Sequence, residues 1–254
     1  MRHGTRKART VKDQDPIETL RRAVAAMDLI DLTHPLAEGM PVWPGHPHFC
    51  QRCISSVARG DASSFCSLAL GEHTGTHFDA PLHFIAEPAG RSIAETPIAH
   101  FFGRMLTLRV SCHQPRSAVE PETLRRWEAQ HGSIATGDAV FFHFGWDRFW
   151  NDDHAAFLAG WPGLSQAASE MLVERGVRIV GSDCLSIDCF DSATYPAHRT
   201  LLGAGVLVGE NFSRLGSLPP VCYLATLPLP IVNGSGSPLR AIALVPRPDD
   251  PSHG

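Results

Sequence analysis

Residues 122–180 contain the run of segments that decides the fold: ETLRRWEAQHG (122–132), AVFFHF (139–144), SQAASEMLVERG (165–176) and VRIV (177–180). The first and third segments predict helices over Glu122–His131 and Gln166–Arg175, each followed directly by a glycine. The other two are short apolar runs typical of buried strands. Helices and strands that alternate at this spacing indicate a partly parallel sheet with crossover helices.

Outward from this region, the same kind of pattern continues in both directions. Asp15-Pro16 predicts the start of a helix over Ile17–Met27, because Asp is a common N-cap and Pro suits the first helical turn. Further strands are expected at Leu29–Leu32, Met105–Val110, Gly205–Val208, Val221–Ala225 and Ala241–Val245. No repeat and no flexible linker separates two cores. We therefore expect one α/β domain with a mixed, partly parallel sheet over residues 16–248, between a disordered leader (1–15) and a short tail (249–254).

Composition narrows the possible partners. The 254 residues carry 22 basic and 26 acidic side chains, so the slightly negative chain gives no reason to expect a nucleic acid. Its longest apolar stretches, such as Leu201–Val208, fall well short of the roughly 20 residues of a membrane-spanning helix. Seven cysteines, an odd number without framework spacing, indicate a reducing compartment. We expect a cytoplasmic protein that binds neither nucleic acid nor membrane.

The unusual feature of the composition is its 14 histidines, and three of them cluster. The segment His73-Thr-Gly-Thr-His-Phe-Asp-Ala-Pro-Leu-His83 holds three His and one Asp in eleven residues. Its Gly, Thr and Pro residues disfavour a helix. In an extended strand, His73, His77 and Asp79 would point the same way, and Gly75 on that face would leave room for an ion.

The chemistry of this cluster indicates a catalytic metal site. Structural zinc sites are usually rich in cysteine, whereas catalytic sites mix His with carboxylate and keep one position open. Pro81 would end the strand and leave His83 in a loop beside the site. His198 and Glu210 are further candidates by sequence alone, although a carboxylate at a strand end is often only solvated.

The cluster also matches, at every fixed position, the HxGTHxDxPxH signature of the cyclase family of metal-dependent hydrolases. That family includes the bacterial kynurenine formamidases and the isatin hydrolases. Flanking segments resemble the family in the right order: Asp31-Leu-Thr-His-Pro-Leu, Pro41-Val-Trp-Pro-Gly, Val180–Asp188, His198-Arg-Thr-Leu-Leu and Gly209-Glu-Asn. The resemblance runs from Asp28 onward and implies a sheet of the swivelling β/β/α type.

Carried over residue by residue, the resemblance implies a metal centre. It implies that His73, His77 and Asp79 bind one ion, and that Asp79 bridges to a second ion held with His198 and Glu210. His and carboxylate ligands suit zinc and also manganese, so we expect one or two ions of either metal. The family's habit also implies a homodimer or a homotetramer.

The resemblance further implies a reaction. His83 resembles the family's catalytic proton donor and acceptor, and Trp43 resembles its substrate-stacking aromatic residue. We expect hydrolysis of an amide-like C–N bond of a small aromatic substrate, of N-formylkynurenine or isatin type, by metal-bound water. An imidazole with an unperturbed pKa near ~6.5 would suit His83 for moving the proton to the leaving amine. One departure is His46, where the formamidases carry Asp after Pro-Gly.

Two alternatives remain, namely a lactone or cyclic-imide hydrolase of the same family and a non-enzymatic metal-binding protein. Other motifs are weak. Gly203–Gly209 has the wrong spacing for a dinucleotide loop, and no G-x-S-x-G nucleophile elbow occurs. Cys50-x-x-Cys53 lacks a second pair, so we interpret it as two ordinary thiols and not as half of a zinc ribbon.

Overall fold

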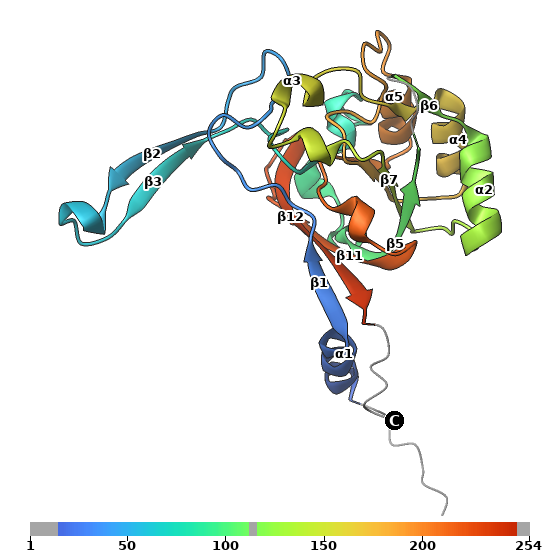
Figure 1. Cartoon of the computed structure of the whole chain (residues 1–254), viewed down its shortest axis with the longest axis horizontal. Coiled ribbons are helices and arrows are strands. Elements are labelled where there is room, and N and C mark those ends of the chain that lie inside the picture. The colour runs from blue at the N-terminus through green and yellow to red at the C-terminus, as the bar shows by residue number, and fades with distance from the viewer. Residues whose placement is uncertain (1–14, 112–115, 248–254) are drawn as a thin grey trace, which may run out of the picture.

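The structure is a computed structural model that describes residues 15–111 and 116–247. The expected tail and all of the expected leader except Asp15 lie outside the described residues. The main element is one sheet of eight strands in the order β1-β12-β11-β5-β7-β9-β10-β4 (Figure 1). These strands are β1 (Met27–Asp31), β4 (His77–Asp79), β5 (Phe102–Arg109), β7 (Ala139–His143), β9 (Ile179–Ser182), β10 (Leu207–Glu210), β11 (Val221–Pro228) and β12 (Gly236–Pro246).

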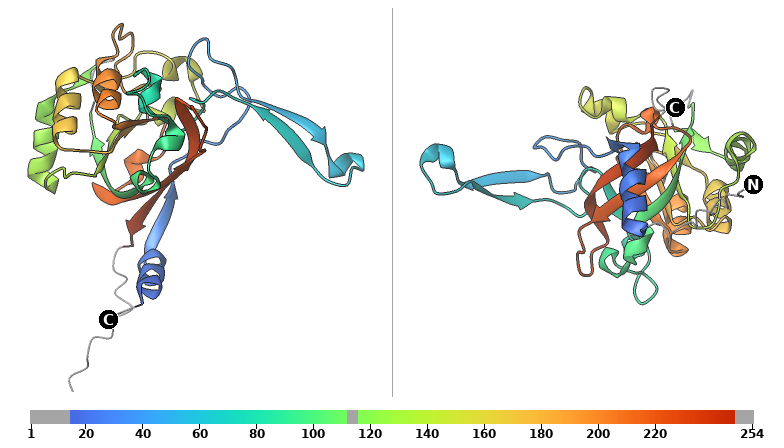
Figure 2. Two further views of the ribbon diagram at one scale, coloured as in Figure 1. Left: turned by 180° about the vertical axis from the view of Figure 1, so that it is seen from behind. Right: turned by 90° about the horizontal axis from the view of Figure 1, so that it is seen from below.

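The sheet is mixed, and it closes on itself. Strands β5, β7, β9 and β10 are parallel neighbours, and the other pairings are antiparallel. Strand β4 pairs with β12 as well as with β10, which brings the two ends of the sheet together in a barrel-like arrangement. The parallel strands are connected by α2 (Pro121–His131), α4 (Gln166–Glu174) and α5 (Pro196–Gly203), which cover one side of the sheet (Figure 2). The expected α/β domain with crossover helices is confirmed.

Local chemistry explains where the helices begin and end. The Asp15 carboxylate accepts the Ile17 N–H at 3.1 Å at the start of α1 (Pro16–Ala25), and the Ser165 hydroxyl accepts the Ala168 N–H at 3.1 Å at the start of α4. Gly132 ends α2 with a positive φ of 97°, which suits a residue without a Cβ. Helix α5 was not expected from the sequence, because it is short and only weakly periodic.

The core has two layers on the two faces of the sheet. Along β7, Val140 and Phe142 pack toward the helices, while Ala139 and Phe141 belong to the cluster inside the barrel. All four side chains are fully buried. This alternation follows from the two-residue period of a strand, and a strand buried on both faces has the continuous apolar sequence seen here.

Short elements complete the fold: α3 (His154–Phe157), the pair β6 (Ala118–Val119) and β8 (Gly163–Leu164), and several single 3₁₀ turns. Within residues 15–111 and 116–247, no helix is long and apolar enough to cross a membrane.

A two-stranded hairpin projects from the body (Figures 1 and 2). We call residues 50–69 the arm; it consists of β2 (Cys50–Ser55), a 3₁₀ turn (Val57–Arg59) and β3 (Phe65–Ala69). No strand was expected here from the sequence. The interpretation of the two CxxC cysteines as ordinary thiols stays a prediction, although both are exposed on β2.

Candidate metal centre and active site

The residues singled out in the sequence gather around one cavity of about 230 Å³. Its lining is Trp43, His46, His73, His77, His83, Phe84, Leu185, Ser186, Tyr195, His198 and Glu210. Asp79 lies among these side chains and is only 1% exposed. The structure therefore brings together the whole predicted set from four separate parts of the chain.

The backbone that presents the cluster differs from the expected strand. Only His77–Asp79 is a strand, and the chain turns before it because Gly75 has a φ of +65°. A Cβ on Gly75 would lie 2.8 Å from Cδ2 of Leu36, so a side chain here would be both strained and crowded. The prediction of one extended face over residues 73–79 was wrong, because the turn at Gly75 is what brings His73 back over Asp79.

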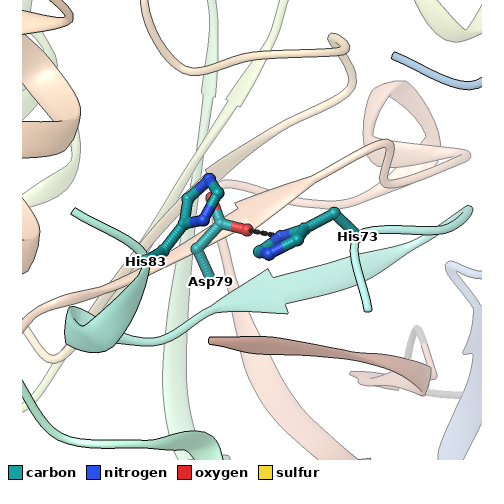
Figure 3. Close-up of side chains that lie close together, drawn as sticks. All are labelled: His73, Asp79 and His83. Atoms are coloured by element: carbon teal, nitrogen blue, oxygen red, sulfur yellow. Dashed lines mark hydrogen bonds and ion pairs between the residues drawn. The ribbon is translucent and has the colours of Figure 1, made fainter. Parts of the chain in front are cut away.

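The second part of the signature also differs from the expectation. Pro81–His83 forms a 3₁₀ turn and not an open loop. Pro81 takes the first helical position, where its missing N–H is not needed. This turn holds the His83 ring 4.0 Å from the ring of His73 (Figure 3).

His77 and Glu210 meet because they are register partners on the antiparallel strands β4 and β10. The Nδ1 of His77 lies 2.8 Å from the Gly75 carbonyl oxygen, so Nδ1 carries the proton that it donates. Its Nε2 then has a lone pair, and it lies 3.2 Å from Oδ1 of Asp79 and 3.5 Å from Oε2 of Glu210. This Nε2 is buried and has no aligned hydrogen-bond partner in the described part of the chain.

His73 is oriented in the same way, by a hydrogen bond to the ring nitrogen that faces away from Asp79. The Ser235 hydroxyl donates to Glu72 at 2.6 Å and accepts the Nε2–H of His73 at 2.9 Å. The other nitrogen, Nδ1, therefore has the lone pair, and it lies 2.5 Å from Oδ1 of Asp79 (Figure 3). Nδ1 of His73 and Oδ1 of Asp79 are both acceptors, and at this distance they repel each other unless a proton or a metal ion lies between them.

His198 repeats the arrangement from helix α5. Its Nδ1 lies 2.6 Å from Oδ2 of Asp188, which marks Nδ1 as the protonated nitrogen. Its Nε2 lies 3.2 Å from Oδ2 of Asp79 and 3.1 Å from Oε1 of Glu210. Three imidazoles thus turn toward two carboxylates a nitrogen that can take up either a proton or a metal ion.

The electrostatics indicate that the site attracts positive charge. Burial opposes a charged His198, but Asp188, Asp79 and Glu210 outweigh it and raise the pKa of His198 well above its ordinary value. Burial also opposes a charged Asp79, yet the surrounding imidazoles hold its pKa well below the ordinary value. The pKa of Glu210 is raised by burial and by the charge of Asp79. Either protons or a cation can satisfy these carboxylates.

A metal ion fits this donor set. The ligand atoms of His77, Asp79 and Glu210 lie within 4.8 Å of one another, as do those of His73, Asp79 and His83. Both groups share Asp79, and their nitrogen and carboxylate oxygen donors suit zinc or manganese. The hydrogen bonds of His73, His77 and His198 to partners outside the centre are the kind that orient metal ligands.

His83 has a perturbed acidity. Its burial lowers its pKa to about 4, with the negative charge of Asp79 acting in the opposite direction. The imidazole is therefore neutral at neutral pH, and the ordinary pKa assumed from the sequence was wrong. A neutral ring beside the metal position can accept a proton.

Aromatic and apolar side chains form the walls of the cavity. Phe84 stacks on His198 with ring centroids 4.8 Å apart, and Trp43, Leu185 and Tyr195 complete the apolar lining. His46 lines the same cavity, and burial lowers its pKa. The position of Trp43 is compatible with the stacking role that the resemblance implies.

Sequence reasoning did not assign a role to the residues behind the ligands. These are Glu72, Ser235 and Asp188. Asp188 lies in a segment that matches the family, which is the one signal that could have found it. Nothing local links Glu72 to Ser235, which is 163 residues away in the chain.

Comparison with known proteins agrees with this site. Residues 30–189 match the family model described as putative cyclase. The chain is 32% identical over 223 residues to a kynurenine formamidase of Salinibacter ruber, covering 85% of this chain and 97% of that protein. It is 29% identical over 248 residues to an isatin hydrolase of Roseibium aggregatum, covering 87% of this chain and 93% of that protein.

Solved structures support the same assignment. An isatin hydrolase bound to the product analogue thioisatinate superposes with a TM-score of 0.86 at 27% identity, covering 92% of this chain and all of that one. Isatin hydrolase A from Labrenzia aggregata, bound to benzyl benzoate, gives 0.84 at 32% identity with the same coverage. With its family model, fold and metal-binding donor set in agreement, the chain belongs to the cyclase family and is a metal-dependent hydrolase.

Proposed function

We propose that the protein hydrolyses an amide-like C–N bond, other than a peptide bond, in a small aromatic substrate. The observation that carries this proposal is the site itself, where nitrogens of three imidazoles face two carboxylates beside an aromatic-walled cavity. Relatives named kynurenine formamidase and isatin hydrolase support a formamide or a cyclic amide as the substrate. A protein that only stored metal would not need an aromatic cavity beside the metal site.

The metal centre is proposed to hold two ions of zinc or manganese. His73, His77 and Asp79 would hold one, and Asp79, His198 and Glu210 would hold the other. When bound, such ions lower the pKa of water and polarise a carbonyl group. Oδ1 of Asp79 lies beside His73 and His77, whereas Oδ2 lies beside His198, and this division supports two ions that share Asp79.

Residues other than the metal ligands orient the substrate, transfer the proton and exclude water. Trp43 stacks on the aromatic ring of the substrate and orients it. His83, which is neutral at neutral pH, accepts the proton of the attacking water and returns it to the leaving nitrogen. Phe84 and Leu185 exclude bulk water from the reacting carbonyl.

The test combines metal analysis with a substrate panel. The purified protein should hold about two metal ions per chain and turn over N-formylkynurenine or isatin, with little activity on simple lactones. His83→Ala should lose at least about a hundredfold in kcat while it keeps its metal. Full turnover by this variant would remove the proton-transfer role. Activity confined to lactones would replace the amide assignment by lactone hydrolysis, and metal binding with no turnover of the panel would contradict a hydrolase of these substrates.

We further propose that the protein self-associates through the arm. Apolar side chains on the arm are exposed, namely Ile54, Val57, Phe65 and Leu68. A single two-stranded hairpin is marginal in water, so a second copy of the chain is the occupant that would cover it. A groove lined by Leu36, Leu227, Leu229 and Leu239 offers that copy an apolar surface.

Light scattering at micromolar concentration tests this assembly. The wild-type protein should have the mass of two or four copies, and the double variant Phe65→Glu, Leu68→Lys should have the mass of one. A monomeric wild-type protein would contradict the proposal. We also propose a cytoplasmic location, which the odd number of cysteines supports and which cell fractionation would test.

A further inference from the structure

Two cysteines of the arm face each other across its strands. Cys53 on β2 and Cys66 on β3 are register partners in the antiparallel pair. Residues directly opposite in such a pair have Cα atoms about 4.5–5.5 Å apart, and a disulfide requires a Cα separation of about 4.4–6.8 Å. The backbone of the arm therefore holds the two thiols at a separation that a disulfide can span.

The partner of Cys53 is not the cysteine that the CxxC spacing suggests. Cys50 lies opposite Ala69 in the same pair of strands. Because side chains alternate along a strand, Cys50 and Cys53 point to opposite faces of β2. Cys53 and Cys66 share a face, as directly opposed residues do. Strand register sets this pair, and no short spacing in the sequence would reveal it.

The Cys53 thiol is accessible and has polar neighbours. Cys53 is exposed, Cys66 is half-buried, and both are free thiols. The Cys53 thiol donates to the Ser55 carbonyl at 3.4 Å, and the Arg59 guanidinium donates to Sγ of Cys53 at 3.6 Å. Desolvation and the adjacent Cys66 thiol raise the pKa of Cys53, whereas the charge of Arg59 stabilises the thiolate once it forms. An oxidant can therefore reach Cys53 first, with Cys66 beside it.

We propose that Cys53 and Cys66 are a reversible redox site, in which a low-molecular-weight disulfide such as oxidised glutathione converts the two thiols into a disulfide across the arm. The Cys53 thiolate attacks one sulfur of the glutathione disulfide, which forms a mixed disulfide and releases one glutathione thiolate. The Cys66 thiolate then attacks Sγ of Cys53, forms the Cys53–Cys66 bond and expels the second glutathione thiolate. The two glutathione thiolates take up the protons that the cysteines lose, so two protein thiols are oxidised and one small disulfide is reduced.

The disulfide fixes the register of the arm. Strands β2 and β3 form a sheet of their own that projects from the body (Figure 1), and an isolated two-stranded hairpin is marginal in water. A bridge between Cys53 and Cys66 closes residues 54–65 into a loop and so reduces the open conformations available to the arm. Exposed disulfides are the labile ones, so the thiols form again when the glutathione pool is reduced.

This inference is independent of the proposed hydrolysis and of the proposed self-association. Both cysteines belong to one chain, and neither lines the metal-site cavity.

The experiment incubates the full chain with oxidised glutathione, blocks the remaining thiols and maps the peptides. Trypsin cleaves after Arg52 and Arg59, so Cys50, Cys53 and Cys66 fall on three separate peptides. The wild-type protein should give a linked pair of peptides that holds Cys53 and Cys66 and excludes Cys50. Its intact mass should be that of one chain less two hydrogen atoms, and dithiothreitol should remove the link.

Two variants separate the pair from an ordinary exposed thiol. Cys66→Ser should stop at the mixed disulfide of Cys53 with glutathione, because the second thiol is missing. Cys50→Ser is the matched control, since it removes an exposed cysteine from the same strand, and it should form the link at the wild-type rate within about twofold. Amide hydrogen exchange in β2 and β3 should slow by at least about tenfold when the wild-type protein is oxidised, and should not slow in Cys66→Ser.

The other products would each overturn the proposal. A link between Cys50 and Cys53 would mean that the sequence spacing, and not the register, selects the pair. A link between two chains would make the arm a site of cross-linking and not of an internal disulfide. A mixed disulfide that persists on wild-type Cys53 would show that Cys66 does not reach it. Unchanged hydrogen exchange in the linked protein would show that the bond does not fix the arm.

Discussion

Asp188 accepts two hydrogen bonds from His198 and a third from Ala197, at the start of helix α5. The Asp188 carboxylate accepts the His198 Nδ1–H at 2.6 Å and the backbone N–H groups of His198 and Ala197 at 3.1 and 2.8 Å. One buried carboxylate thus caps the helix, selects the imidazole tautomer and directs Nε2 toward Asp79 and Glu210. The metal centre depends on this residue although Asp188 is not among its proposed ligands.

Replacing Asp188 by Asn should weaken metal binding without removing any ligand. The amide can present an N–H where His198 now donates, which favours the other tautomer and puts the ring proton on Nε2, where the metal would bind. We expect metal affinity to fall by about 10–100-fold, as is typical for partners that orient a ligand. Competition with a chelator measures this affinity. Asp152→Asn, at an exposed position, is the control, and equal affinity in both variants would show that Asp188 does not orient the ligand.

Removing the metal should destabilise the fold. Ligand binding to the folded state alone adds about 2.7 kcal/mol to the free energy of unfolding at a hundredfold excess over Kd. Thermal unfolding with and without a chelator should therefore give a lower Tm for the metal-free wild-type protein. Asp79→Asn removes the residue shared by both groups of ligand atoms, so its Tm should hardly respond to the chelator. A chelator shift as large as that of the wild-type protein would place the metal elsewhere.

Gly75→Ala should damage both stability and the metal centre. The left-handed backbone at Gly75 costs an alanine about 1–2 kcal/mol, and the new Cβ would press on Leu36 at 2.8 Å. Gly205 is a matched control, because it has a φ of +80° and a Cβ added there would meet nothing within 4 Å. Chemical denaturation should show a loss of stability in both variants, whereas only Gly75→Ala should lose metal affinity. Unchanged affinity there would mean that the turn does not position His73 and His77.

The stability of the protein should depend on pH through Asp183. Burial raises the pKa of this carboxyl to about 7, even though it accepts the Phe144 and Trp146 N–H groups at 2.9 and 2.7 Å. Between about pH 4 and pH 7 the folded state therefore holds a proton that the unfolded state releases. The free energy of unfolding should fall as the pH rises through this window, by up to about 1.4 kcal/mol per pH unit, and should level off above it.

Asp183→Asn tests this dependence, because an amide does not titrate. The difference between wild type and variant should change with pH between about 4 and 7 and stay constant above. Urea denaturation at several pH values measures it, with Asp152→Asn as the control. A wild-type slope that persists in Asp183→Asn would assign the pH dependence to another group.

Much of the fold follows from local patterns in the chain. The helices α2 and α4 and the strands β5, β7 and β9 were predicted to within a few residues, because apolar periodicity and helix-ending glycines act over short distances. The eleven-residue signature likewise identified His73, His77, Asp79 and His83 as a group. Residues close in sequence need only a local backbone conformation to meet.

Other features depend on contacts that no local pattern encodes. The pairing of β4 with both β10 and β12 closes the sheet, and that closure brings Ser235 against Glu72 and His73. The expected strand over residues 73–79 was wrong, since the turn at Gly75 is stabilised by packing and by long-range hydrogen bonds and not by the preferences of its neighbours.

The sequence alone therefore predicted which histidines and carboxylates form the site, and it predicted metal-dependent chemistry from their types and spacing. Only the tertiary structure decided which nitrogen of His73 and of His198 faces the centre, because Ser235 and Asp188, which hold the other nitrogens, lie on separate segments. It also decided that His83 is neutral, since its low pKa results from burial. A sequence specifies which donors exist, whereas their burial, and the orientation of His73 and His198, arise only when separate segments pack together.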